Sequence, residues 1–239
     1  MKTAVVIGAT SGMGRGLALR LAGDGYNVGV TGRRESLLQD LAQMDKEHIV
    51  PLVMDITDTG RTEECLLHFL AIWGKIDLLI LCAGTGELNH SLDFAIEENT
   101  IHTNIIGFTF VADWAYRQFE RQGYGQLVIL SSIAGLRGDA GAPAYNATKA
   151  YQINYAQGLR KKSVKSGLPI IITDIRPGFV DTAMAKGEGL FWITPLEKAV
   201  SQIYRAIHKK RPVVYVSKRW GWVATLLKMI PARIYHQIG

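Results

Sequence analysis

Tyr145 and Lys149 lie four positions apart in the short run PAYNATKAY, residues 143–151. Four residues make about one helical turn, so on a helix the phenol and the ammonium group leave the same face. A phenol titrates near pH 10 and is a poor acid or base at neutral pH. A neighbouring ammonium group favours the phenolate and brings the pKa toward the range where acid–base catalysis is efficient. The pair is suited to proton transfer, and the other residues must decide whether its spacing is accidental.

The composition is that of one folded α/β domain. The chain has 239 residues, of which 48% are hydrophobic and 20% charged, enough for a single sizeable core. We expect a dinucleotide-binding catalytic domain over residues 1–217, with residues 218–239 as a basic, aromatic, amphipathic tail of the same domain. The net charge of +6 suits anionic ligands or lipid surfaces, or is simply a solvated basic surface. No basic block is interleaved with aromatic residues, so we expect no nucleic-acid partner.

The two cysteines, Cys65 and Cys82, have no metal-ligand spacing, so we expect a reducing, cytoplasmic setting and no metal site. The N-terminal run MKTAVVIGATSG has too short an apolar stretch for a signal peptide and reads as a first strand. No stretch approaches the about 20 apolar residues that a membrane span requires.

Short apolar runs alternate with longer amphipathic ones along the chain. We predict strands at 3–8, 27–32, 49–54, 76–81, 126–131, 170–175 and 212–217, most of them continuously apolar and rich in Val and Ile. We predict helices at 13–24, 35–44, 58–73, 93–122 (broken), 144–166 and 195–209. This alternation predicts a Rossmann-type, doubly wound parallel sheet of about seven strands flanked by helices.

A glycine-rich turn follows the first predicted strand directly. It reads Gly8-Ala9-Thr10-Ser11-Gly12-Met13-Gly14 and runs into a helical stretch. Glycines in such a turn let the backbone approach a pyrophosphate, and the helix N-terminus supplies free N–H groups and partial positive charge. We therefore predict that the turn binds a dinucleotide.

With its Gly-x-x-x-Gly-x-Gly spacing, the sequence resembles the short-chain dehydrogenase/reductase family over about residues 3–182. Ser132 lies 13 residues before Tyr145, and Asn104 lies 28 residues before Ser132. These spacings match the Asn–Ser–Tyr–Lys tetrad that the resemblance implies. Ser131 is one residue out of register, and the alternation of a strand points it the other way.

The resemblance assigns a role to each member of the tetrad. Tyr145 is expected to be the general acid in ketone reduction and the general base in alcohol oxidation, and to contact both substrate and cofactor. Lys149 would lower the pKa of Tyr145 and bind the nicotinamide ribose. Ser132 would donate a hydrogen bond to the substrate oxygen. Asn104 would hold a water that links Lys149 to solvent.

The end of the second strand bears on the choice of cofactor. A carboxylate there would accept from the ribose 2′-hydroxyl of NAD, whereas a 2′-phosphate favours arginine. The chain has Gly32-Arg33-Arg34, and a guanidinium group can clamp a phosphate. We predict NADP(H) over NAD(H), with Arg33 the favoured contact; a solvated loop is the alternative.

The resemblance implies further cofactor contacts along the chain. They are Asp55 and Ile56 at the adenine, Ala83 and Gly84 after the fourth strand, and Pro177, Gly178, Val180 and Thr182 around the nicotinamide. Three positions depart from the family pattern: Ile7 replaces a threonine, and Leu81 and Cys82 replace two asparagines. Because both partners of one implied hydrogen bond are then apolar, we interpret the change as compensated and Cys82 as an inert, buried thiol.

The segment AKGEGLFWIT, residues 185–194, follows the last cofactor contact. Its glycines and apolar tip suit a loop, about 183–194, that closes over a hydrophobic substrate; a packed surface loop is the alternative. We expect Phe191 and Trp192 to contact substrate together with Ser132 and Tyr145.

The tail combines Trp220, Trp222 and Leu226 with basic residues and carries no acid. It fits an amphipathic helix on an anionic membrane, packing on its own sheet, or a subunit interface. Pro231 should end the helix.

We interpret the chain as an NADP(H)-dependent oxidoreductase that exchanges hydride between nicotinamide and a ketone or secondary alcohol. A homodimer or homotetramer is expected by analogy with the family. Two alternatives stay open: a cofactor-binding regulatory protein with weak catalysis, and a membrane-surface reductase of lipid-linked substrates. The sequence does not identify the substrate, which is expected to be a small carbonyl or alcohol.

Overall fold

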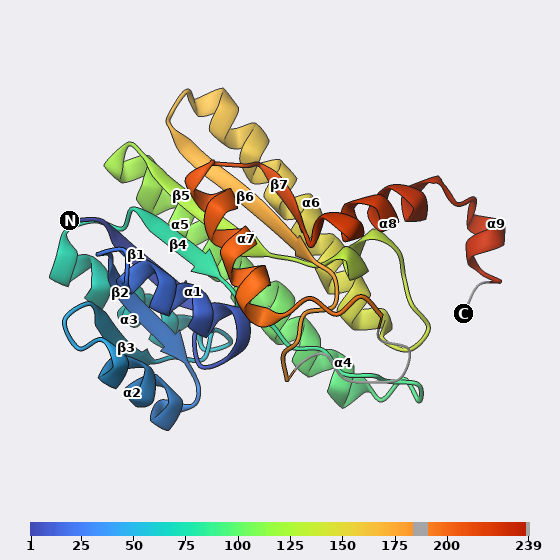
Figure 1. Ribbon diagram of the computed structural model, residues 1–239, viewed down its shortest axis with the longest axis horizontal. Helices are drawn as coiled ribbons and strands as arrows, with labels where there is room; N and C mark the ends of the chain where they lie inside the picture. The colour runs from blue at the N-terminus through green and yellow to red at the C-terminus, as the bar shows by residue number, and fades with distance from the viewer. Residues whose placement is uncertain (184–190, 238–239) are drawn as a thin grey trace.

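A seven-stranded parallel sheet forms the middle of the molecule (Figure 1). The computed structural model describes residues 1–183 and 191–237. The strand order is β3-β2-β1-β4-β5-β6-β7, which confirms the predicted doubly wound fold. The strands are β1 (Thr3–Ile7), β2 (Asn27–Gly32), β3 (Ile49–Val53), β4 (Leu78–Leu81), β5 (Gly125–Leu130), β6 (Ile170–Pro177) and β7 (Val213–Val216).

Helices cover both faces of the sheet, which explains why its strands read as continuous apolar runs. One face packs against α1 (Gly12–Ala22), α2 (Glu35–Met44) and α7 (Leu196–His208). The other packs against α3 (Thr59–Trp73), α5 (Phe108–Gln122) and α6 (Pro143–Ser166). All five residues of β1 are buried because the strand contributes alternately to the two apolar cores.

The chain order reverses between β1 and β4, which lie side by side in parallel register. In an open α/β sheet, ligands bind in the crevice outside the carboxyl ends of the strands at such a switch point. The glycine turn follows β1 at that edge and the Ala83–Gly84 segment follows β4. The fold therefore brings the two predicted cofactor segments together.

The predicted helix over 93–122 is interrupted, as expected. It consists of α4 (Phe94–Ile101), a π-helical segment η1 (His102–Gly107) and α5. A π-turn widens the backbone locally and is frequent at functional sites. Asn104 lies inside this segment and is fully buried.

The C-terminal residues form α8 (Lys218–Met229) and the short α9 (Ala232–Tyr235), which project from one end of the molecule (Figure 1). α8 ends two residues before Pro231, as predicted. A 3₁₀ turn, η2 (Ile133–Leu136), follows β5 and lies beneath α8.

Candidate active site

The glycine turn is packed so tightly that side chains are excluded at two of its positions. A Cβ on Gly14 would lie 2.2 Å from the Gly8 carbonyl oxygen, and a Cβ on Gly8 would lie 2.6 Å from the Ala83 nitrogen. Gly8 and Gly12 also have φ angles of +87° and +55°, which favour glycine. The turn, the start of α1 and the end of β4 are thus held in contact at the carboxyl edge of the sheet.

The N-terminus of α1 offers donors for an anion. Ser11 is the N-cap in extended conformation, and its side chain makes no capping hydrogen bond to the helix. The first N–H groups of a helix lack partners within it and carry partial positive charge. Met13, which is predicted to contact the cofactor, lies in the first turn of α1. Its side chain is partly buried and packs against the apolar core.

The departures from the family pattern are accommodated by apolar packing. Ile7 and Leu81 are each 1% exposed, are neighbours in register and belong to the same core cluster. Cys82 packs toward the opposite face of the sheet, so the apolar neighbour of Ile7 is Leu81. Burial raises the pKa of the Cys82 thiol to about 12, which keeps it protonated, although the residue as a whole is only partly buried.

The two arginines after β2 point to different partners. Arg34 donates from one guanidinium nitrogen to the hydroxyls of Thr10 (2.5 Å) and Ser11 (2.8 Å). Arg33 forms an exposed ion pair with Asp55 at 3.8 Å. The guanidinium that reaches the glycine turn therefore belongs to Arg34, whereas the sequence favoured Arg33.

Asp55 is fixed by its own turn. Its Oδ1 accepts from the backbone N–H and the hydroxyl of Thr57, at 3.0 and 2.9 Å. The next residue, Ile56, is 5% exposed and its carbonyl meets Gly107 at the end of the π-segment. The predicted adenine positions thus lie at the end of β3, next to Arg33.

Two adjacent serines after β5 face opposite ways, as strand alternation predicts. The Ser132 hydroxyl caps η2, accepting from the Ala134 N–H at 3.1 Å. The Ser131 hydroxyl donates to Asp174 Oδ1 at 2.5 Å and belongs to a buried polar network beneath β6. Asp174 is in turn paired with Arg176 at 2.7 Å. Of the two serines, Ser132 is the one on the side of the site.

Tyr145 and Lys149 lie in the first turns of α6 and share a face. The Lys149 Nζ is 5.7 Å from the centre of the Tyr145 ring. The ring also lies over Gly86, where a Cβ would approach it to 2.2 Å. Lys149 is 5% exposed, and its ammonium group donates to the Leu130 carbonyl at 3.1 Å.

The titration of this pair differs from the prediction. Burial raises the pKa of Tyr145, and a hydrogen bond with Ser132 offsets part of that rise. Burial lowers the pKa of Lys149 to about 8, against smaller opposing effects of Cys82 and Asp174. The prediction that Lys149 lowers the pKa of Tyr145 is therefore not met in the structure described: the phenol is held protonated, and the ammonium group itself is perturbed.

Asn104 is held rigidly by its neighbours. Its amide accepts from the Thr85 N–H at 2.9 Å and donates to the Thr85 carbonyl at 2.7 Å and to Thr148 Oγ1 at 3.0 Å. Its main-chain carbonyl accepts a hydrogen bond from the side chain of Gln152 at 2.9 Å. Sequence reasoning missed Gln152; its place one turn after Lys149 was the available signal.

The segment after β6 returns to the glycine turn. Gly178 donates to the Val216 carbonyl at 2.8 Å, and Val180, 4% exposed, bridges to Thr194. The methyl group of Thr182 lies where a Cβ on Gly12 would approach it to 3.3 Å. Of the residues predicted around the nicotinamide, Thr182 therefore lies beside the glycine turn, whereas Pro177 and Gly178 pair with the end of β7.

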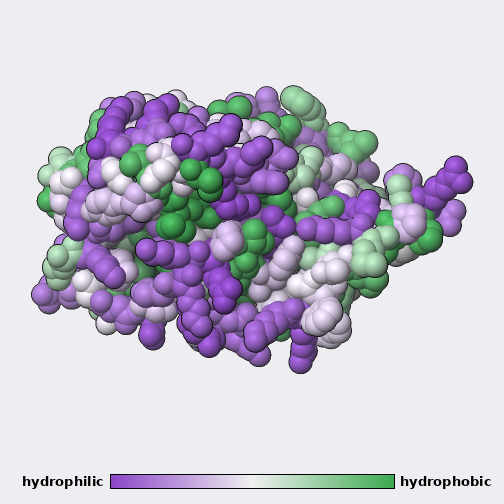
Figure 2. Space-filling model, turned by 90° about the horizontal axis from the view of Figure 1, so that it is seen from above, coloured by the Kyte–Doolittle hydropathy of each residue, from purple (hydrophilic) through white to green (hydrophobic). Residues whose placement is uncertain are grey.

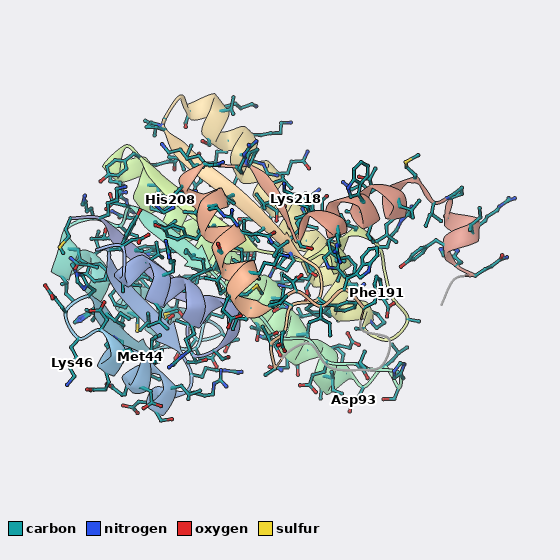
Figure 3. The ribbon with its side chains drawn as sticks, in the orientation of Figure 1. Met44, Lys46, Asp93, Phe191, His208 and Lys218 are labelled. Atoms are coloured by element: carbon teal, nitrogen blue, oxygen red, sulfur yellow. The ribbon has the colours of Figure 1, made fainter. Side chains whose placement is uncertain are left out.

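An aromatic cluster closes this side of the site. It consists of Phe179, Phe191, Trp192 and Trp220, with ring centres 5.1 Å apart for Phe191–Trp220 and 5.4 Å for Phe179–Trp220. Figure 3 shows Phe191 near α8. Phe191 and Trp192 are about half exposed. The remainder of the predicted substrate loop, residues 184–190, lies outside the described residues.

Trp220 joins the tail to the site. It is 2% exposed, and its indole ring fills the space where a Cβ on Gly178 would lie 2.2 Å away. Arg137 further fixes α8 by donating to the Leu227 and Ile230 carbonyls, at 3.0 and 2.7 Å. One face of the tail therefore packs on the rest of the domain.

The site fits a dinucleotide cofactor. A glycine turn without room for a Cβ, an open helix N-terminus and a guanidinium group beside them suit a pyrophosphate and its neighbouring charge. Among the described residues, no group of three or more His, Cys, Asp or Glu side chains could hold a metal ion. The described helices also include none that is long and apolar enough to cross a membrane.

Comparison with known proteins agrees with this geometry. The family model for short chain dehydrogenase matches residues 2–190. An uncharacterized oxidoreductase of Myxococcus xanthus is 36% identical over 188 residues, which are 77% of this chain and 74% of that protein. Another from Staphylococcus haemolyticus is 31% identical over 190 residues, covering 77% and 80%.

Solved structures share the fold. A short-chain dehydrogenase from Streptomyces avermitilis superposes with a TM-score of 0.82 at 23% identity, over 95% of this chain and 91% of the other. The closed form of serine dehydrogenase complexed with NADP+ gives 0.81 at 25% identity, over 89% and 93%. The chain therefore belongs to the short-chain dehydrogenase/reductase family and is an NAD(P)-dependent oxidoreductase.

Proposed function

We propose that this enzyme is an NADPH-dependent carbonyl reductase in which Tyr145 protonates the substrate oxygen. The observation that carries the proposal is the convergence of Tyr145, Ser132 and Lys149 at one edge of the sheet, beside the glycine turn. The bound cofactor would supply the hydride. The chain would supply the proton donor and a hydroxyl that orients the substrate oxygen.

The titration of Tyr145 favours the reducing direction. A phenol whose pKa is raised by burial stays protonated at neutral pH and is ready to act as an acid. The Ser132 hydroxyl lowers the pKa of that phenol, so it also stabilises the phenolate that remains after proton transfer. The protonated phenol is the form that ketone reduction requires.

The substrate side supports a hydrophobic carbonyl compound. The half-exposed rings of Phe191 and Trp192 lie against buried Trp220, and flat apolar surfaces of this kind bind apolar groups. For the cofactor we propose NADP(H), held by Arg34 and Arg33. The carbonyl compound, this cofactor and further copies of the chain, packed through α5 and α6, are the proposed partners, with the cytoplasm as location.

A screen of hydrophobic ketones, followed by the absorbance of NADPH, tests the proposed reaction. We expect turnover by the wild-type enzyme and a rate lower by about 10²–10⁴-fold for Tyr145→Phe, with NADPH binding largely retained in a fluorescence titration. Retained activity in the variant would remove Tyr145 as the acid. Binding of NADPH without turnover of any ketone would favour the regulatory alternative.

A second candidate, action at a membrane surface, is favoured by the outer face of α8. Trp222, Leu226 and Met229 are 82%, 62% and 74% exposed and follow the i, i+4, i+7 spacing of one helical face. Lys218 and Arg219 begin the same helix, and residues 218–237 contain no acid. Figure 2 shows hydrophobic and hydrophilic residues side by side on the projecting end. This pattern suits an anionic lipid surface.

Vesicle binding tests the second candidate. Truncation of the tail would also remove Trp220 from the core, so point variants are preferable. We expect sedimentation with phosphatidylserine-containing vesicles but not with phosphatidylcholine alone, and loss of binding in Trp222→Ser/Leu226→Ser. Val164→Ser, which removes another 82% exposed apolar side chain, is the matched control. Equal binding by both variants would eliminate the idea.

A further inference from the structure

Gln152 bridges two members of the tetrad. Its Oε1 accepts a hydrogen bond from the Lys149 Nζ at 3.0 Å, and its Nε2 donates to the Asn104 main-chain carbonyl at 2.9 Å. The exposed fractions are 5% for Lys149, 1% for Gln152 and 0% for Asn104. The bridge is thus a buried, continuous path of hydrogen bonds with an amide at its centre.

The elements around the bridge fix its geometry. Gln152 lies three residues after Lys149 on α6, so both side chains leave the same helical face. Asn104 lies in the π-segment that packs against α6. The clamp on its side-chain amide by Thr85 and Thr148 sets the direction of its main-chain carbonyl. The amide of Gln152 therefore meets a fixed acceptor on one side and a fixed donor on the other.

We propose that Gln152 is a positioning residue that takes the place of a water between Lys149 and Asn104 and closes this route for protons. A water in that place could accept a proton on one side and release one on the other. A carboxamide can accept from the ammonium and donate to the carbonyl, but it does not titrate at ordinary pH. Tyr145 would then regain its proton from the side on which the substrate binds.

Few other groups compete with Gln152 for the ammonium group. Cys82 approaches Lys149 from the end of β4 as a neutral thiol, and Asp174 acts from β6 but is paired with Arg176. The Tyr145 ring lies 5.7 Å away and the Leu130 carbonyl accepts a second hydrogen bond. Among the described residues, Gln152 supplies the one side-chain hydrogen bond to this ammonium group. Its replacement should therefore change the pKa and the proton exchange of Lys149 directly.

Exchange of the Lys149 ammonium protons with water provides the first test. It can be measured by NMR on ¹⁵N-lysine-labelled, cofactor-free protein near pH 6, where the group is protonated. We expect slow exchange in the wild type and at least tenfold faster exchange in Gln152→Ala, because water can enter the space left by the amide. Equally fast exchange in both proteins would overturn the proposal.

The pKa of Lys149 provides the second test and remains informative should Gln152→Ala fold poorly. Gln152→Glu should raise this pKa and Gln152→Leu should lower it, each by about one unit. Gln126→Leu is the matched control, because Gln126 donates to Thr173 and Ile207 at the far end of the sheet. The same pKa in all four proteins would refute the bridge. The role in proton supply rests on the proposed function, but neither measurement requires turnover, so the two ideas can fail separately.

Discussion

At the carboxyl edge of the sheet, Asn104, Ser132 and Lys149 are at most 9% exposed, and each takes part in hydrogen bonds. On the outer face of α8, in contrast, the side chain of Trp222 is 82% exposed. The two regions meet at Trp220, which belongs to the tail but packs on Gly178. The comparison separates two kinds of specificity. Directional hydrogen bonds orient the reacting groups. Exposed apolar side chains, which impose no fixed geometry, face the proposed substrate and the solvent.

The largest expected effect tests whether the tail is a structural part of the domain. Trp220→Ala removes a nearly fully buried ring and should lower the free energy of unfolding by about 3–5 kcal/mol. Trp222→Ala, two residues away and exposed, should change it by less than about 0.5 kcal/mol. Chemical denaturation measures both.

Trp220→Phe is the informative control for that comparison. It keeps an aromatic ring and removes an indole N–H that has no hydrogen-bond partner among the described residues. Its stability should therefore lie between that of the wild type and that of Trp220→Ala, because the smaller ring leaves a smaller cavity than alanine does. Similar losses for the alanine variants at 220 and 222 would mean that the tail does not contribute to the core.

The next largest effect distinguishes the roles of Ser132 and Ser131 at the carboxyl edge of the sheet. Ser132→Ala removes the proposed hydrogen bond to the substrate oxygen and should lower kcat by about 10²–10³-fold. Ser131→Ala should retain kcat but cost about 1–3 kcal/mol of stability, because Asp174 loses a buried donor. Steady-state kinetics on the best ketone and thermal denaturation measure the two quantities. The reverse pattern would exchange their roles.

The pH dependence of stability follows from the buried ammonium group. Lys149 has a pKa of about 8 in the folded chain and about 10.4 when unfolded. Between these values the unfolded chain binds the proton and the folded chain does not, so stability rises with pH across this window. Relative to Lys149→Met, the wild type should gain about 3 kcal/mol from pH 8 to pH 10.4.

Parallel denaturation curves of the two proteins across that pH range provide the measurement. Groups remote from residue 149 contribute equally to both proteins and cancel in the difference. A difference in unfolding free energy that does not change with pH would show that burial does not lower the pKa of Lys149.

Sequence reasoning reached the polar region more easily than the apolar one, for a physical reason. The glycine turn and the tetrad are recognisable because their chemistry demands particular residue types at fixed spacings. The direction of Trp220 was not readable, since inward and outward faces of α8 are both apolar. Gln152 was missed because its partner is the main-chain carbonyl of Asn104. The direction of that carbonyl depends on a π-turn, which no local sequence pattern predicts.

The titration of Tyr145 was mispredicted for a related reason. Helical spacing predicted the approach of the Lys149 ammonium group correctly, but the burial of both groups depends on the whole fold. Desolvation then raises the pKa of the phenol and lowers that of the ammonium group, which opposes the effect of their proximity.

The smallest expected effect concerns cofactor choice, where the polar region reaches the surface. Arg34 contacts the glycine turn, and Arg33 is tied to Asp55. Arg34→Ala should therefore weaken NADPH about tenfold, as expected for one charge-assisted contact, and leave NADH unchanged. Arg33→Ala should weaken NADPH less, because part of its charge is already neutralised by Asp55. Fluorescence titration with each cofactor separates these results.

Arg15 offers a matched control for the cofactor experiment. Its guanidinium group starts from α1 but points to the Leu37 carbonyl on α2, at 3.4 Å. Arg15→Ala removes the same charge from the same region without removing a contact to the turn, so a general electrostatic effect would appear in it as well. Equal losses of NADPH and NADH in Arg34→Ala would detach the arginine from the phosphate. A larger NADPH-specific loss in Arg33→Ala would instead restore the choice that the sequence favoured.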